Sequence, residues 1–134
     1  MAARDYLNVK IWDVCNTSKP LLTVNLQESL KSKLCDLFEN DSIYDKFYLS
    51  ASEDGNELLT GNYNNSFHVV STTGDNYQYE LNYKKSTVIK PMTGSKAAGL
   101  TKLDNVRKTT ALGFNPGKKM FAVASLNCFF IYSV

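Results

Sequence analysis

The strongest constraint on the fold is a regular succession of short β-type runs between residues 43 and 83. Stretches rich in Gly, Asn and Asp separate the runs, at residues 52–56, 64–65 and 73–76. These residue types favour turns because they tolerate left-handed backbone or hydrogen-bond to their own backbone. Short strands joined by short turns are typical of an antiparallel meander, so we predict a four-stranded sheet over residues 43–83.

The same alternation of apolar and polar residues returns on both sides of this meander. Residues 7–26 predict two strands, the second of which begins at Pro20, where a missing backbone donor is tolerated. Residues 106–134 predict three further strands. Between residues 84 and 105 the pattern is lost among scattered Gly, Pro, Ser and Lys, which predicts a loop.

One helix is expected among these strands, from about residue 26 to residue 38. Its apolar residues follow the spacing of a single helix face: Leu30, Leu34, Leu37 and Phe38. Asn25 and Glu28 have the spacing of a capping box, in which the two side chains bond free backbone N–H groups. A polar, acidic corner at residues 39–42 then leads into a strand over residues 43–51, which places charged and aromatic side chains on the rim of the sheet.

Three segments of the chain are similar to one another: Tyr6–Asp13, Tyr63–Ser71 and Leu126–Ser133. Each contains an Asn near a turn, an alternating strand, and a bulky residue followed by Asp or Ser. The bulky residues are 58 and 62 positions apart, more than the roughly 40–45 residues of a WD40 blade. The expected helix and loop account for the excess, so this repeat predicts the blades of a β-propeller.

We therefore expect an all-β fold, a partial WD40 β-propeller of about two blades with antiparallel four-stranded sheets and one inserted short helix. Residues 7–26 would end one blade, with Trp12-Asp13 as the marker that closes its third strand. Residues 43–83 would form a complete blade, and residues 106–134 three strands of the last blade. The missing outer strand would come from the far end of a longer chain, so we expect the C-terminal part of a larger ring, truncated at Met1.

The composition excludes several classes of partner. A net charge of +2 on 134 residues leaves no basic stripe for nucleic acid, and no run of eighteen apolar residues is present to cross a membrane. Cys15, Cys35 and Cys128 are odd in number and far apart, which argues against disulfides and for a reducing compartment. We expect a cytoplasmic protein, with the nucleus as a second location.

No motif in the sequence indicates catalysis. His68 has no Cys or second His at ligand spacing, so no metal site is predicted. Cys35, on the expected helix, has no base beside it and is expected to be a buried, inert thiol. No Gly-rich phosphate loop is present. We therefore expect neither an enzyme nor a bound cofactor.

The most specific signal lies in three dense stretches of sequence: Arg4 to Asp13, Lys33 to Phe47 and Thr60 to Asn65. These stretches closely resemble the WD40-repeat, B-class (55 kDa) regulatory subunits of serine/threonine protein phosphatase 2A. The resemblance covers most of the chain and is densest in its first half. Three positions depart from the residues that are usual in the family: Ser42, Tyr44 and Tyr48.

The resemblance implies a seven-bladed propeller without catalytic activity. Members of this class bind the scaffold (A) and catalytic (C) subunits of the phosphatase and select phosphoprotein substrates. The family's main scaffold-binding hairpin lies in an early blade, outside this chain. Contact with protein substrates is implied for five residues at the acidic and aromatic corner: Phe38, Glu39, Asp41, Tyr44 and Lys46.

A structural role competes with the binding role at this corner. Its acids can attract the basic segments that flank phosphosites, and Phe38 and Tyr44 offer rigid aromatic area. Lys46 could pair with a substrate acid, or with Asp45 or Asp41. In the structural alternative, Asp41 caps a turn, Phe38 packs under the helix and Lys46 is solvated. The resemblance favours the binding role for Asp41, Tyr44 and Lys46, whereas Phe38 is equally suited to the core.

Two functional hypotheses follow from the sequence. The first is a non-catalytic regulatory subunit that selects substrates and targets the phosphatase; the alternative is a stand-alone small β-sheet module for protein interaction. In either case, about two blades leave an apolar flank and strand edges without neighbours. We therefore expect the isolated chain to be poorly soluble or to self-associate.

Overall fold

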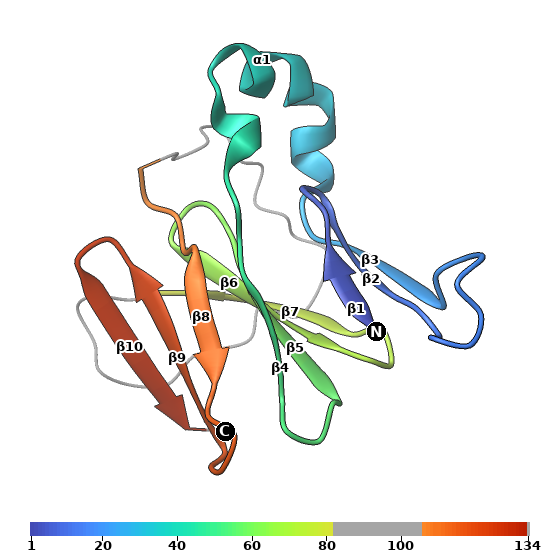
Figure 1. Ribbon diagram of the computed structural model, residues 1–134. Helices are drawn as coiled ribbons and strands as arrows, with labels where there is room; N and C mark the ends of the chain where they lie inside the picture. Colours follow the sequence, from blue (N-terminus) through green and yellow to red (C-terminus); the bar gives the residue numbers. More distant parts are fainter. Residues whose placement is uncertain (82–105, 134) are drawn as a thin grey trace.

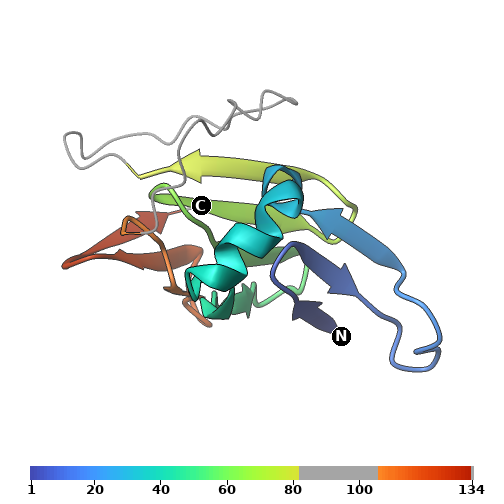
Figure 2. The same ribbon diagram turned by 90° about the horizontal axis from the view of Figure 1, so that it is seen from above.

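The strands that the structure describes form three antiparallel sheets, with a helical segment across one end of them (Figure 1). The computed structural model describes residues 1–81 and 106–133 of the chain. Seen from above, the helical segment lies over the middle sheet and between the two outer sheets (Figure 2). Within the described ranges, no helix has the length and apolar character needed to cross a membrane.

The middle sheet is a four-stranded meander whose strands are hydrogen-bonded in chain order. Its strands are β4 (Leu49–Ala51), β5 (Glu57–Gly61), β6 (Ser66–Ser71) and β7 (Asn76–Glu80). Positive φ angles at Gly55, Gly74, Asn64 and Asn65 make the tight turns between them. The turn residues that the sequence singles out therefore do join neighbouring strands.

Each outer sheet has three described strands, also in chain order. The first contains β1 (Ala2–Arg4), β2 (Asn8–Ile11) and β3 (Leu22–Asn25). The other contains β8 (Ala111–Phe114), β9 (Met120–Ser125) and β10 (Cys128–Ser133). Strand β1 was not predicted, because three residues are too few to show an alternating pattern.

One face of the middle sheet packs against the sheet β1–β3. Leu58 and Val70 are directly paired across β5 and β6, so their side chains share this face. They form a buried cluster with Val9 and Val24 of the neighbouring sheet. Burial of this apolar surface drives the two sheets together.

The opposite face packs against the sheet β8–β10. Leu59 and Phe67 project on this side and form a second buried cluster with Phe121 and Val123. The rings of Phe67 and Phe121 meet edge to face, with centroids 5.7 Å apart. The middle sheet is thus buried on both faces, and the apolar core consists of two layers rather than one.

Antiparallel sheets packed face to face, each with strands in chain order, confirm the prediction of a partial β-propeller. The described strands form open sheets and no closed barrel. The assignment of residues 7–26, 43–83 and 106–134 to particular blades stays a prediction. The loop predicted over residues 84–105 lies outside the described residues.

The expected helix over residues 26–38 is divided into two elements, η1 (Glu28–Lys33) and α1 (Leu34–Glu39). The capping box is also only half formed. The Asn25 side-chain oxygen accepts from the Gln27 N–H at 3.2 Å, but the Asn25 amide donates to the Glu28 carboxylate, which does not reach back to the backbone. Gln27 is buried and donates to Asn62, so a tertiary contact sets this helix start.

The strand expected from residue 43 begins only at Leu49, so that part of the prediction was wrong. Residues Ser42–Tyr44 form a single 3₁₀ turn, η2. The N–H of Tyr48 donates to the carbonyl of Thr110, at 3.0 Å. The segment before β4 therefore hydrogen-bonds to the chain before β8 through the Tyr48 N–H, while the Tyr48 carbonyl accepts from the Thr60 hydroxyl of β5 at 2.8 Å.

Gly61, at the end of β5, allows this close approach of two backbones. A Cβ placed on Gly61 would lie 1.7 Å from the carbonyl oxygen of Thr109, while the Thr109 N–H donates to Asn62 at 2.9 Å. We predict that Gly61→Ala destabilises the fold by about 2–3 kcal/mol or more, because backbone must move to admit the methyl group. Urea unfolding followed by circular dichroism measures this change.

Gly113 supplies the matched control for this prediction. It also lies in a strand, but a Cβ placed there meets no atom within 4 Å. Gly113→Ala should therefore leave the free energy of unfolding unchanged or raise it slightly. Equal unfolding midpoints for the two variants would contradict the close approach at Gly61.

Candidate functional site

The helical corner, residues 34–46, exposes two aromatic side chains beside each other. Phe38 of α1 is 59% exposed and Tyr44 of η2 is 63% exposed. Their ring centroids are 6.3 Å apart and the ring planes are inclined by 52°. Phe38 therefore does not pack under the helix, and the core role that its spacing also allowed is excluded.

Leu37, which the sequence places on the apolar face of the helix, is buried. Leu30, Leu37 and Tyr63 form a buried cluster beneath the corner. Partly buried residues pack against this cluster: Tyr6, Leu7 and Phe47. The short helix α1 thus presents one apolar side to the sheets and Phe38 to solvent.

Asp41 lies at the turn between α1 and η2, in the left-handed conformation with φ of 56°. Its backbone N–H donates to Phe38 at 3.2 Å, and its carbonyl accepts from Tyr44 at 3.4 Å. Its side chain makes no capping hydrogen bond. The backbone of Asp41 therefore forms the turn, while the carboxylate remains at the surface.

The exposed charge of the corner is mostly acidic. Asp36, Glu39 and Asp41 are exposed, with no basic residue between positions 36 and 41. Lys46 is also exposed. It does not pair with Asp45, because Asp45 forms an ion pair with Lys108. All five sequence-predicted residues, including Phe38 and Tyr44, thus lie on the surface of one short segment.

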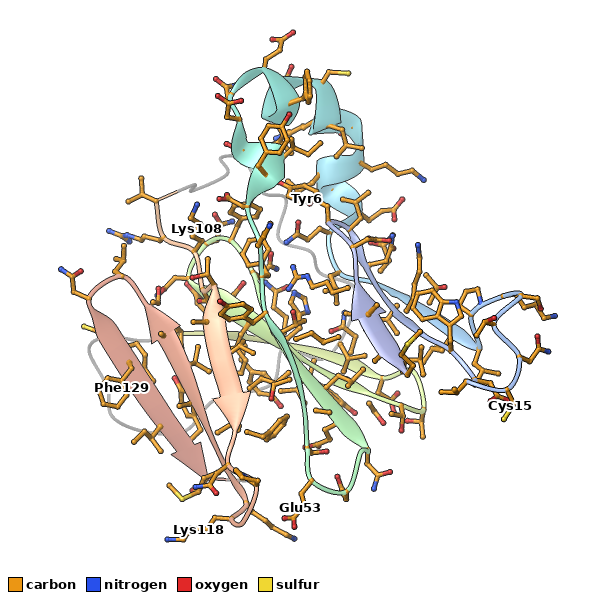
Figure 3. The ribbon with its side chains drawn as sticks, viewed as in Figure 1. Tyr6, Cys15, Glu53, Lys108, Lys118 and Phe129 are labelled. Atoms are coloured by element: carbon orange, nitrogen blue, oxygen red, sulfur yellow. The ribbon has the colours of Figure 1, made fainter. Side chains whose placement is uncertain are left out.

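Beneath the corner, a partly buried tyrosine hub links four parts of the chain: Tyr6, Ser42 with Asp45, Tyr63, and Lys108. The Tyr63 hydroxyl donates to Asp45 Oδ2 at 2.8 Å, and lies 3.1 Å from the carbonyl oxygen of Ser42. The hydroxyls of Tyr6 and Tyr63 are 2.8 Å apart. Lys108 donates to the other oxygen of Asp45. Figure 3 shows Tyr6 and Lys108 at the base of the helical segment.

Burial raises the pKa of both tyrosines in this hub, since the charged phenolate is disfavoured away from water. For Tyr63 the hydrogen bonds to Tyr6 and Asp45 raise the pKa further. Both hydroxyls therefore stay protonated over the physiological pH range. They can hold the carbonyl of Ser42 and the carboxylate of Asp45 in place without a change of charge.

Arg4 of β1 connects the hub to the middle sheet. Its guanidinium lies 4.5 Å from the centroid of the Phe47 ring and donates to Thr60 and to the carbonyl of Gly61. Burial lowers the pKa of Arg4 to about 10, which leaves it charged at neutral pH. The Phe47 ring in turn meets Tyr63 edge to face, with centroids 5.0 Å apart.

Sequence reasoning found the exposed corner but missed the hub that supports it. Tyr63 lies 18 positions from Asp45, and Lys108 lies 63 positions from it. No local pattern connects residues at such distances. The only available signal was the resemblance itself, which includes Tyr63 and the whole of the corner.

The predicted structural marker Trp12-Asp13 directly follows β2, which is the central strand of its sheet. Trp12 is partly buried, and its backbone N–H donates to the carbonyl of Met1 at 2.8 Å. The Asp13 carboxylate accepts from the Cys15 N–H at 2.8 Å and so holds the turn after the strand. These contacts explain how the pair ends a strand, while its meaning as a blade marker stays a prediction.

Cys35 is exposed, as are Cys15 and Cys128. The prediction of a buried thiol at Cys35 was therefore wrong. The reason is the helical phase, because Leu37 is buried toward the sheets and Cys35, two positions before it in the helix, lies on the opposite side. Among residues 1–81 and 106–133, no group of three or more His, Cys, Asp or Glu side chains could hold a metal ion.

His68 is buried in the middle sheet between two asparagines. Its Nδ1–H donates to Asn76 and its Nε2 accepts from Asn62, both at 2.8 Å. The Asn62 oxygen is already used by the Tyr63 N–H, at 2.8 Å, and by Gln27. Both ring nitrogens therefore have structural partners, and burial lowers the pKa of His68 to about 4.

The chain is similar in sequence to regulatory subunits of a protein phosphatase. The chain is 35% identical over 143 residues to the protein phosphatase PP2A 55 kDa regulatory subunit of Drosophila melanogaster. It is 30% identical over 155 residues to the serine/threonine-protein phosphatase 2A regulatory subunit phr2AB of Dictyostelium discoideum. Each match covers 98% of this chain. The chain is a relative of the B-class regulatory subunits of protein phosphatase 2A.

The resemblance predicted from the three dense stretches is thus confirmed. A PP2A regulatory subunit of the same class from Schizosaccharomyces pombe is also similar, with 34% identity over 161 residues. The present chain spans about a third of the length of the proteins it matches, between 29% and 35% of each. No protein-family model matches the chain.

We predict that Tyr63→Phe lowers the free energy of unfolding of the chain by about 1–3 kcal/mol. The change removes the hydroxyl that donates to the Asp45 carboxylate and lies 3.1 Å from the Ser42 carbonyl oxygen, in a place where water replaces it poorly. Tyr48 is 65% exposed, so Tyr48→Phe is the matched control and should have no measurable effect. Urea unfolding compares the two variants, and equal stability would contradict the hub's role.

A second prediction concerns pH and rests on His68, the only histidine of the chain. Its pKa is lower in the folded state than the unfolded value of 6.5, so the unfolded chain binds a proton first as the pH falls. The free energy of unfolding should have its full value above pH 6.5. As the pH is lowered from 6.5 toward 4, it should fall by up to about 1.4 kcal/mol per pH unit. Urea midpoints between pH 7.5 and 5 test this expectation.

The control for the pH prediction is His68→Gln, which has no titrating group at this position. Its unfolding midpoint should be almost constant between pH 7.5 and 5, whatever its absolute stability. A parent chain whose midpoint is equally flat over this range would show that His68 is not buried in its neutral form.

Proposed function

We propose that this chain is the substrate-facing part of a regulatory subunit of protein phosphatase 2A and acts by binding, not by catalysis. Its proposed partners are the scaffold (A) and catalytic (C) subunits and phosphoprotein substrates, in the cytoplasm and the nucleus. The single observation that carries the proposal is the exposed Phe38–Tyr44 pair on an acidic corner. The assignment to protein phosphatase 2A rests on the names of the relatives described above.

The aromatic pair suits protein recognition. Large aromatic side chains give much contact area and lose little conformational entropy on binding, and such residues dominate binding energy in protein interfaces. Both rings are well over half exposed and lie together. In a folded chain a large exposed aromatic pair of this kind favours a contact with a partner.

The charge around the pair favours a basic segment of the partner. Asp36, Glu39 and Asp41 are exposed acids, and unlike charges raise the rate at which partners meet. Asp45 does not add to this field, because Lys108 neutralises it. Lys46, on the far side of η2, supplies one positive charge that could meet an acid or a phosphate of the substrate.

The tyrosine hub would make this surface rigid before a partner arrives. Tyr63 and Tyr6 hold the turn at Ser42 from below, while Leu30 and Leu37 anchor the helical segment to the same place. A preorganised surface loses less entropy on binding than a mobile loop does. The proposed contact residues are therefore carried by a fixed platform.

The first experiment measures binding of a fluorescent phosphopeptide with flanking arginines. We expect Phe38→Ala/Tyr44→Ala to weaken binding by about 10-fold or more, as removal of central aromatic contacts does elsewhere. The matched control is Val14→Ala/Leu21→Ala, which removes two exposed apolar side chains far from the corner, 72% and 71% exposed. The control should bind like the parent chain.

Charge reversal separates the role of the acids from that of the rings. Asp41→Lys should slow association, and the difference from the parent should shrink as salt is added. Lys46→Glu should weaken capture of the phosphorylated peptide more than that of its unphosphorylated form. Unchanged capture by both variants would overturn the proposed use of this corner.

Co-purification with the scaffold and catalytic subunits tests the wider assignment. Recovery of the chain with both subunits supports a regulatory role. Phosphopeptide binding without any recovery of the subunits would instead favour a stand-alone interaction module, the alternative that the sequence leaves open.

A further inference from the structure

A short extended segment, residues 45–48, joins the helical corner to β4. Asp45 has φ and ψ angles of −60° and 130°, which are extended values. Its carboxylate accepts from the Tyr63 hydroxyl, and the Phe47 ring meets the Tyr63 ring edge to face. Asp45 and Phe47 therefore both point toward the tyrosine hub. Because successive side chains of an extended chain point to opposite sides, the residues that alternate with them point away from the hub.

The residues on that outer side form an exposed row that begins at the corner: Tyr44, Lys46 and Tyr48. All three are exposed, whereas the two residues between them are partly buried. The exposed fractions of Tyr44 and Tyr48 are 63% and 65%. Phe38 lies beside Tyr44, with ring centroids 6.3 Å apart. The row therefore continues the surface proposed for substrates, over roughly 13 Å at the usual rise of an extended chain.

Both flanks of this segment are covered by other parts of the chain. On one flank the Tyr48 N–H donates to the carbonyl of Thr110, at 3.0 Å, in the chain before β8. On the other, the Phe47 ring lies against the guanidinium of Arg4 in β1. Figure 1 shows the segment running from the helical corner to β4 between β8 and β1. The row is thus exposed with a neighbouring sheet on each side, unlike the outer face of a terminal sheet.

The chemistry of the surface changes in order along the row. The three exposed acids of the corner lie at one end, Lys46 lies in the middle, and the aromatic ring of Tyr48 lies at the other end. Asp45, the neighbour of Lys46, pairs with Lys108 and so does not neutralise it. The complementary partner is a segment in which basic residues, a phosphate and an apolar side chain follow one another.

We propose that Tyr48 forms a subsite for a large apolar side chain of the phosphoprotein substrate, two residues beyond the phosphorylated residue and away from its basic segment. An extended peptide presents every second side chain to the same surface, at the spacing that separates Lys46 from Tyr48. A phosphate at Lys46 thus brings the second residue beyond it over the Tyr48 ring. A basic residue in that place would lie beside Lys46 and be repelled, so an apolar residue fits better.

This subsite rests on the proposed function, since it assumes that the corner binds a phosphoprotein segment. It adds a selectivity that the corner does not supply, because the Phe38–Tyr44 pair and the acids lie on the other side of Lys46 along the row. Tyr48 is also one of the positions at which this chain departs from the residues usual in the family. The selectivity is therefore expected of this chain and not of the whole class.

Fluorescence anisotropy of phosphopeptides with the 134-residue chain tests the subsite. Each peptide has arginines on one side of a phosphoserine and Leu or Ala two positions away on the other side. Both chain directions are made, and the one that binds more tightly is used. The parent chain should bind the Leu peptide about 5-fold more tightly than the Ala peptide. Tyr48→Ala should bind both peptides equally, with unchanged circular dichroism. The matched control, Leu21→Ala, removes another exposed side chain and should keep the preference.

Three results would overturn the subsite: equal affinity of the parent chain for both peptides, a Tyr48→Ala variant that keeps the preference, and a preference for Leu at the first or third position instead of the second. The last result would mean that the bound peptide is not extended along this row. If Phe38→Ala/Tyr44→Ala still weakens binding in these cases, the proposed function stands and only the subsite fails. If no phosphopeptide binds the parent chain, both fail together.

Discussion

The structure depends on a middle sheet that is apolar on both faces. A strand with one polar face can lie against a core and face water on the other side, but β5 and β6 cannot. Leu58 and Val70 need cover on one face, and Leu59 and Phe67 need it on the other. Two further sheets supply that cover. The result is a stack in which each sheet is stabilised by its neighbours, as in repeat proteins.

This stack also creates the platform for the helical corner. Tyr6, Tyr63 and Lys108 come from the three different sheet regions and meet beneath Ser42 and Asp45. The hydrogen bonds of the hub form only when the sheets are in place, and they then hold a short helical segment that could not be stable alone. The exposed aromatic pair therefore owes its position to contacts between sheets.

Much of the fold could be predicted from local pattern, because alternation with a period of two is visible along a single strand. The four-stranded order of β4–β7 and the three strands of β8–β10 follow from it. The strand predicted from Ile43 failed because aromatic residues favour strands in general, whereas here Asp45 and Phe47 are engaged in the hub and beside Arg4. The prediction that Cys35 is buried failed for a similar reason. The side of the helix that faces the core depends on which of its residues pack against the sheets.

The sequence by itself determined the strand pattern, the turns and the family, because these are recorded in residues close together in the chain. It also marked the corner residues from Phe38 to Lys46 as candidates for binding. Only the tertiary structure decided that Phe38 is exposed and Leu37 buried, and that Asp45 pairs with Lys108. The reason is physical: burial and pairing depend on atoms from distant parts of the chain, and their proximity exists only after the sheets have packed together.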